Sequence, residues 1–120
     1  MKKRILIIDD NQDLLELLKI VFLDSGYEVI FLQSVPETNY INTLHPNLIL
    51  LDVRFNESQR EGAELCKNLK ADPETAKLPV ILCSGGYNLP EIARGCNADM
   101  YLEKPYDIVS LLYHVNKYLS

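Results

Sequence analysis

Short apolar runs without polar interruption alternate with helical patterns along this chain, and the alternation constrains the fold more than any other feature. Residues 5–8, 48–51 and 80–83 are each four consecutive apolar residues. A strand with one face in water shows a polar residue at every second position, so these runs predict strands buried on both faces. Strands of this kind occur in parallel sheets that carry helices on both sides.

Helical spacing fills the segments between the apolar runs. A first helix is predicted from Asp13, with an apolar stripe at i, i+4, i+7 and i+8, and it is expected to stop at Ser25-Gly26, where Gly26 can adopt the left-handed conformation. Ser34 and Glu37 have the spacing of a capping box for a short second helix that ends near residues 44–46. Further helices are predicted over 63–70, 89–95 and 108–120, and further strands over 28–32 and 100–103.

Five strands alternating with five helices predict an α/β fold, a doubly wound five-stranded parallel sheet with right-handed crossovers and helices on both faces. The 120 residues match one domain, residues 1–120, and the sequence leaves open whether this is a complete regulator or a piece of a longer chain. In such a sheet ligands bind outside the carboxyl ends of the strands. Polar residues at those ends are therefore the first candidates for a site.

Composition excludes some classes of function. Twelve Lys and Arg against seventeen Asp and Glu give a net charge of −5, which disfavours direct binding to nucleic acid through a basic field. No apolar run approaches the roughly 20 residues that cross a bilayer, and no signal peptide is visible, so no membrane insertion is expected. The three cysteines lack C-x-x-C spacing, which fits a reduced, cytoplasmic protein.

Polar residues follow four of the predicted strands. Asp9 and Asp10 come after residues 5–8, Asp52 after 48–51, Ser84 after 80–83 and Lys104 after 100–103. Because the carboxyl ends of parallel strands share one edge, we expect these side chains to converge. Close carboxylates repel one another unless they are protonated or hold a divalent cation, and an oxygen-only ligand set favours Mg²⁺. An ammonium and a hydroxyl supply partners for phosphoryl oxygens.

Each of these residues also has an ordinary structural interpretation. The Asp9-Asp10 pair can be the N-cap of the first helix, Asp52 can cap a loop, Ser84 can belong to the turn at Gly85-Gly86, and Lys104 can be a solvated surface charge. The functional hypothesis therefore depends on the set rather than on any one member.

With these residues in place, the chain resembles the receiver domain of two-component response regulators over essentially all 120 residues. The resemblance is carried by the two strands that run into Asp9-Asp10 and Asp52, by Ser84, and by the run from Ala98 to Pro105. It implies a flavodoxin-like sheet in the order 2-1-3-4-5. It also implies phosphorylation of Asp52 by a histidine kinase or histidine phosphotransfer protein, and control of a downstream effector or covalently linked output domain, with a homodimer as a further option.

The resemblance assigns roles to individual residues. Asp10, Asp52 and the backbone carbonyl of Arg54 are expected to bind Mg²⁺ directly, with Asp9 acting mainly through water. Ser84 and Lys104 are expected to hold phosphoryl oxygens, Ser84 and Tyr101 to form the switch, and the Lys104-Pro105 peptide bond to be cis. A signalling protein rather than an enzyme is the expectation.

Two departures from the family pattern keep other hypotheses open. The loop between Asp52 and Gly62 is about two residues longer than usual, and the segment after Ser84 is correspondingly short. These features motivate the alternative of a receiver-like docking or dimerisation module that works without phosphorylation. A third hypothesis, a phosphatase or phosphotransferase acting on a small molecule, needs a pocket lining that the sequence does not show.

Overall fold

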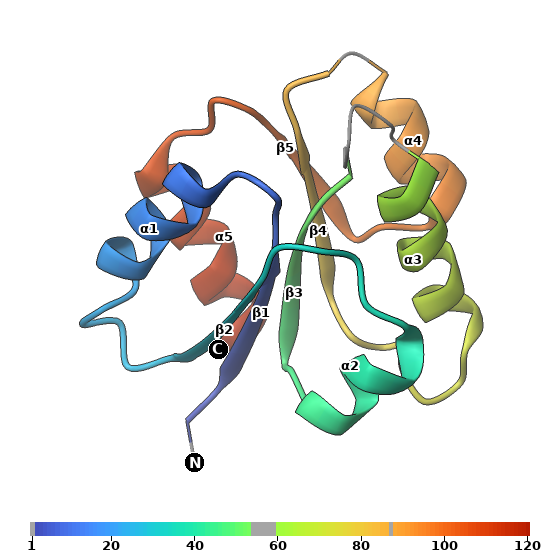
Figure 1. Ribbon diagram of the computed structural model, residues 1–120, viewed down its shortest axis with the longest axis horizontal. Coiled ribbons are helices and arrows are strands. Elements are labelled where there is room, and N and C mark those ends of the chain that lie inside the picture. The colour runs from blue at the N-terminus through green and yellow to red at the C-terminus, as the bar shows by residue number, and fades with distance from the viewer. Residues whose placement is uncertain (1, 54–59, 87) are drawn as a thin grey trace.

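The computed structural model of the chain describes residues 2–53, 60–86 and 88–120, and within them five parallel strands form one sheet in the order β2-β1-β3-β4-β5 (Figure 1). This confirms the predicted fold class and strand order. The strands are β1 (Arg4–Ile8), β2 (Glu28–Leu32), β3 (Leu48–Asp52), β4 (Val80–Ser84) and β5 (Met100–Glu103).

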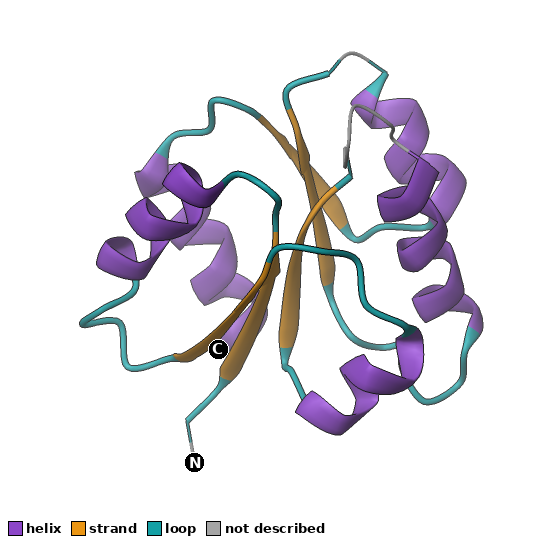
Figure 2. Ribbon diagram, in the orientation of Figure 1, coloured by secondary structure: helices purple, strands orange, loops and turns teal. Residues whose placement is uncertain are grey.

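Helices cover both faces of the sheet (Figure 2). On one face lie α1 (Gln12–Val21) and α5 (Ile108–Leu119), and on the other lie α2 (Thr38–Leu44), α3 (Arg60–Ala71) and α4 (Leu89–Cys96). Alternate residues of each central strand enter the two cores: Ile5 and Ile7 pack toward α1 and α5, while Leu6 and Ile8 pack toward α2 and α3. This double burial is why the strand runs carry no polar residue.

The register of the central strands sets the level at which each strand ends. Ile8 of β1 lies opposite Leu51 of β3. The next residues, Asp9 and Asp52, therefore lie at the same level along their strands. Asp52 in turn lies opposite Cys83, which places Ser84 one residue further along β4. The pairing of parallel strands thus brings the polar residues after three strands to one edge.

The first helix begins and ends differently from the sequence prediction. Its N-cap is Asn11, whose side chain accepts a hydrogen bond from the Leu14 amide, so neither Asp9 nor Asp10 is the cap. The helix ends at Val21 rather than at Ser25-Gly26, and Gly26, with φ of 86°, takes the left-handed conformation in the turn before β2.

The capping box predicted for the second helix is wrong. Glu37 itself is the N-cap of α2, and it makes no side-chain cap hydrogen bond. Pro36 explains the difference, because the residue before a proline is disfavoured in the helical region and a helix starting after Ser34 would need Val35 there. His45, with φ of 50°, ends the helix, as the prediction placed it.

Candidate functional site

The carboxyl ends of β1, β3 and β5 bring together two carboxylates and an ammonium. The Lys104 Nζ lies 2.6 Å from Oδ2 of Asp9 and 3.4 Å from Oδ2 of Asp52. Both aspartates are buried, with about one twentieth of their surface exposed (4% and 5%), and Lys104 is partly buried. A lysine ammonium between two buried carboxylates excludes its interpretation as a solvated surface charge.

Asp10 completes an acidic cluster with Asp9 and Asp52. One carboxylate oxygen from each of the three residues lies within 4.8 Å of the others, and Asp10 is the exposed member of the set. Three oxygen ligands with one side open to solvent suit a hard divalent cation that keeps several of its waters, as Mg²⁺ does. The cluster can therefore hold a metal ion, as the strand-end pattern predicted.

Electrostatic forces at this edge keep Lys104 protonated. Burial alone lowers the pKa of an ammonium, but the hydrogen bond to Asp9 and the negative charges of Asp52 and Asp9 outweigh that effect and raise the pKa of Lys104 above its usual value. Beneath the site, burial raises the pKa of the Cys83 thiol; the charge of Lys104 opposes this effect, and the charges of Asp52 and Asp9 add to it. Lys104 is thus a fixed cation, and Cys83 stays an uncharged part of the core.

Asp9 also shapes the chain around itself. Its Oδ1 accepts a hydrogen bond at 2.9 Å from the backbone N–H of Asn11, which leads directly into α1. The second carboxylate oxygen faces Lys104, so the two oxygens of Asp9 have different partners. Asn11, which the sequence analysis did not single out, therefore fixes both the start of α1 and the orientation of Asp9.

Ser84 lies fully buried at the end of β4. Its Oγ accepts a hydrogen bond from the Gly86 amide at 3.1 Å, and its carbonyl accepts one from the Lys104 amide at 2.9 Å. The side chain thus has the turn role that the sequence analysis gave as the alternative. The backbone contact also ties β4 to Lys104.

Tyr101 lies on β5 away from the acidic cluster. Its side chain is 41% exposed, and it borders a surface hollow between α4 and α5 that Pro90, Ala93 and His114 also line. The Lys104-Pro105 bond is cis, as predicted. Arg54, the predicted carbonyl ligand, lies outside the described residues.

A glycine in α3 supports the site from behind, and sequence reasoning did not find its role. A Cβ built on Gly62 would lie 2.6 Å from the backbone of Val53, the residue directly after Asp52. Only glycine lets α3 pack this closely on the end of β3. The sequence shows Gly62 as the first glycine after the long loop, but its contact with Val53 depends on how α3 packs on β3.

Comparison with models of known protein families identifies the family of this chain. The family model described as the response regulator receiver domain matches residues 5–116. This chain belongs to that family. Receiver domains are signalling modules of two-component response regulators, and the acidic cluster with Lys104 is the polar centre of this receiver domain.

Two curated relatives differ in how much of their own length the match covers. The receiver domain is 32% identical to the polar-differentiation response regulator DivK of Brucella ovis, covering all of this chain and 98% of DivK. It is 31% identical to the DNA-binding dual master transcriptional regulator RpaA of a Synechocystis strain, over 97% of this chain. The match spans 48% of RpaA, so about half of that relative lies outside the comparison.

Solved structures share the whole architecture. A CheY-like receiver domain protein from Methanospirillum hungatei is 28% identical, with a TM-score of 0.85 and coverage of 98% of this chain and 93% of that one. The receiver domain of a histidine kinase from Syntrophus aciditrophicus is 32% identical, with a TM-score of 0.82 and coverage of 98% and 89%.

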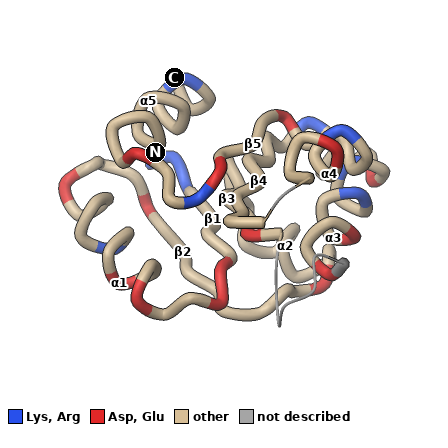
Figure 3. Tube along the Cα trace, turned by 90° about the horizontal axis from the view of Figure 1, so that it is seen from above, with Lys and Arg blue, Asp and Glu red and all other residues tan. Residues whose placement is uncertain are grey.

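The distribution of charge and the length of the helices bear on two kinds of partner, nucleic acid and membranes. In the view from above, acidic and basic residues are interspersed around the receiver domain rather than sorted to opposite sides (Figure 3). Among the described helices, none has the length and apolar character needed to span a membrane.

Proposed function

We propose that the receiver domain accepts a phosphoryl group on Asp52. The observation that carries this proposal is the acidic cluster of Asp9, Asp10 and Asp52 beside the Lys104 ammonium, at the edge where the fold binds ligands. Mg²⁺ is the cofactor that the cluster fits, with Asp10 and Asp52 as direct ligands and Asp9 acting through water. When bound, the ion neutralises charge on the phosphoryl group and on the carboxylates.

The protein residues then have separable tasks. An oxygen of Asp52 attacks the phosphorus of a phosphohistidine, the P–N bond breaks, and the imidazole leaves with a proton from solvent. Lys104 compensates negative charge on a phosphoryl oxygen, since its ammonium already lies 3.4 Å from Asp52. Ser84 donates a hydrogen bond from its hydroxyl to a second phosphoryl oxygen once the side chain turns from the Gly86 amide toward that oxygen.

Phosphorylation at Asp52 is proposed to act on the surface of α4, β5 and α5 through Ser84 and Tyr101. Ser84 is the last residue of β4, and Tyr101 lies on the adjacent strand β5. Tyr101 pairs there with Leu82, two residues before Ser84. Movement of Ser84 toward the phosphoryl group opens space into which the exposed Tyr101 ring can turn. Such a local change biases a surface with two conformations.

The proposed partners follow from this role. The phosphoryl donor is a histidine kinase or histidine phosphotransfer protein, and the reader of the switch is a downstream effector or a covalently linked output domain. Two relatives support both forms of output, since the match covers 98% of DivK, a polar-differentiation response regulator, but 48% of RpaA, a DNA-binding transcriptional regulator.

The decisive experiment is intact mass after incubation with a small phosphodonor and Mg²⁺. Wild type should gain one phosphoryl group, about 80 Da, and Asp52→Ala should gain none. Asp13→Ala, which removes another aspartate from the first turn of α1, is the matched control and should react like wild type. Phosphorylation that persists in Asp52→Ala contradicts the proposal. Absence of any gain in wild type favours a docking module that works without phosphorylation.

A further inference from the structure

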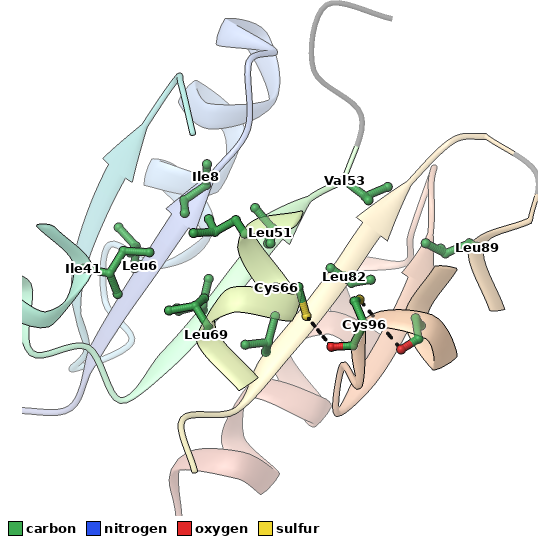
Figure 4. Packing of buried hydrophobic residues seen from close by; sticks show 14 residues of the cluster. Leu6, Ile8, Ile41, Leu51, Val53, Cys66, Leu69, Leu82, Leu89 and Cys96 are labelled. Carbon is green, nitrogen blue, oxygen red and sulfur yellow. Dashed lines mark hydrogen bonds between the residues drawn. The ribbon is translucent and has the colours of Figure 1, made fainter. Parts of the chain in front are cut away.

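Two of the three cysteines meet between helices on the face of the sheet that carries α2, α3 and α4. Cys66 belongs to α3 and Cys96 is the last residue of α4, and both are buried in the same hydrophobic core. The Cys66 thiol donates a hydrogen bond to the Cys96 carbonyl at 3.5 Å, and the Cys96 thiol faces the Ala93 carbonyl at 3.8 Å (Figure 4). Residues thirty positions apart thus meet between α3 and α4, with the Cys66 thiol against the backbone of Cys96.

We propose that Cys66 and Cys96 form a redox pair, which a hydroperoxide converts into a disulfide that joins α3 to α4. All three cysteines are free thiols in this structure, and the proposed receiver chemistry uses none of them. The proposal is independent of phosphorylation, since neither thiol belongs to the acidic cluster.

The two thiols differ in the way that a nucleophile and a resolving thiol must differ. The neighbouring Cys66 side chain, two backbone amides and the charge of Lys70 together outweigh burial and lower the pKa of Cys96 to about 7. The neighbouring Cys96 side chain and burial raise the pKa of Cys66, whose thiol keeps its proton. Since the thiolate is the nucleophile, Cys96 is the sulfur that reacts first.

Position agrees with this order. Cys96 ends α4 and retains 3% exposure, whereas Cys66 is fully buried in the middle of α3. Asn97 follows Cys96 in the left-handed conformation, which ends the helix there. A helix end opens at a lower free energy than the middle of a packed helix, so a small peroxide reaches Cys96 before Cys66.

The chemistry balances with one peroxide. The Cys96 thiolate attacks a peroxide oxygen: the S–O bond forms, the O–O bond breaks, and the departing hydroxide takes a proton from solvent to become water. The Cys66 thiol then attacks the Cys96 sulfur: the S–S bond forms, the S–O bond breaks, and the hydroxide leaves with the Cys66 proton as a second water. Two electrons pass from the two thiols to the peroxide.

A disulfide here connects the helix that follows Asp52 to the helix that follows Ser84. The relative position of α3 and α4 then becomes fixed by a covalent bond instead of by packing alone. Because α4 belongs to the proposed output surface, oxidation is a second input to the same surface.

The test uses the whole chain, hydrogen peroxide as the probe, and no phosphodonor. Wild type should lose about 2 Da on oxidation and regain it with dithiothreitol, and a non-reduced peptide map should show residues 66 and 96 in one linked pair. Cys83→Ala is the matched control, because Cys83 is equally buried but lies in the core on the α1 and α5 face, and it should react as wild type does. Cys66→Ser, which keeps a hydrogen-bonding side chain beside Cys96 but removes the resolving thiol, should stop at a sulfenic acid on Cys96, a gain of about 16 Da that dimedone traps.

Several results would overturn the proposal. These are oxygen additions to wild type without the loss of two hydrogens, a link that involves Cys83, a disulfide between two chains, and no reaction with excess peroxide. The peptide map of wild type decides the question even if a cysteine variant fails to fold.

Discussion

The ammonium of Lys104 lies 2.6 Å from a carboxylate oxygen of Asp9, although 95 positions separate the two residues in the chain. The contact joins the carboxyl end of β5 to that of β1, although β3 and β4 lie between these two strands in the sheet. Asp9 is nearly fully buried, so its charge has little access to water and depends on Lys104. Lys104 therefore contributes both to the stability of the fold, through Asp9, and to the proposed phosphoryl chemistry at Asp52.

Replacing Lys104 with Gln should lower the free energy of unfolding by about 3 kcal/mol, because the buried Asp9 carboxylate loses its cation. Urea unfolding at pH 7 without divalent cations measures the change. Lys19→Gln is the control: Lys19 pairs with Glu16 at 3.2 Å, both side chains are about half exposed (50% and 57%), and the loss should stay below about 1 kcal/mol. Equal losses in the two variants would show that the Asp9 contact adds nothing beyond a surface pair.

Mg²⁺ should stabilise the receiver domain through Asp10. An ion that binds only the folded state stabilises it by about 1.4 kcal/mol at ten times its dissociation constant. For a domain of this size that corresponds to a rise of about 3 to 6 °C in Tm. Asp10→Asn should raise the Tm in chelator, because one of three close negative charges is gone, and should lose most of the Mg²⁺ response.

Thermal melts of wild type and Asp10→Asn, with Mg²⁺ and with chelator at matched ionic strength, compare the two effects. Asp13→Asn controls for loss of a negative charge elsewhere in the same segment and should keep the full Mg²⁺ response. An equal response in wild type and Asp10→Asn would show that Asp10 is not a ligand.

A phosphoryl mimic should move resonances beyond the acidic cluster. With beryllofluoride and Mg²⁺, we expect amide chemical shifts to change around Tyr101 and along α5, because Ser84 turns toward the mimic and the Tyr101 ring leaves its exposed position. Asp52→Ala under the same conditions should show no such change. Shifts confined to the neighbours of Asp9, Asp52, Ser84 and Lys104 would disprove the switch.

Two glycines in helices should respond in opposite directions to substitution with alanine. Gly62→Ala places a methyl group 2.6 Å from the Val53 backbone and should destabilise the fold by about 1 to 3 kcal/mol. Gly95→Ala meets no atom within 4 Å and should stabilise by up to about 1 kcal/mol, since alanine favours the helix. Unfolding in urea gives both values. A neutral Gly62→Ala would mean that α3 shifts away from β3 at no cost.

Local features of the sequence were enough to predict the central strands and the edge of the sheet at which the site lies. Burial on both faces leaves an uninterrupted apolar run, so residues 5–8, 48–51 and 80–83 identified the central strands directly. A polar residue at the end of such a run must lie at the carboxyl edge of a parallel sheet. Asp9 and Asp52 were therefore predictable as neighbours from the sequence, and Lys104 joined them because it follows the strand predicted over 100–103. The strand order came from the family resemblance, because each run fits several positions in a sheet.

The start of α2 and the contacts between helices did not follow from periodicity alone. Helix starts depended on competing local choices, as at Ser34 and Glu37, where Pro36 moved the start of α2 to Thr38. The meeting of Cys66 with Cys96, and the approach of Gly62 to Val53, required the actual positions of α3 and α4. Burial and periodicity act on each segment alone and are readable from its residues. A contact between two helices depends on the angle and distance at which both pack on the sheet, and only the tertiary structure determines these.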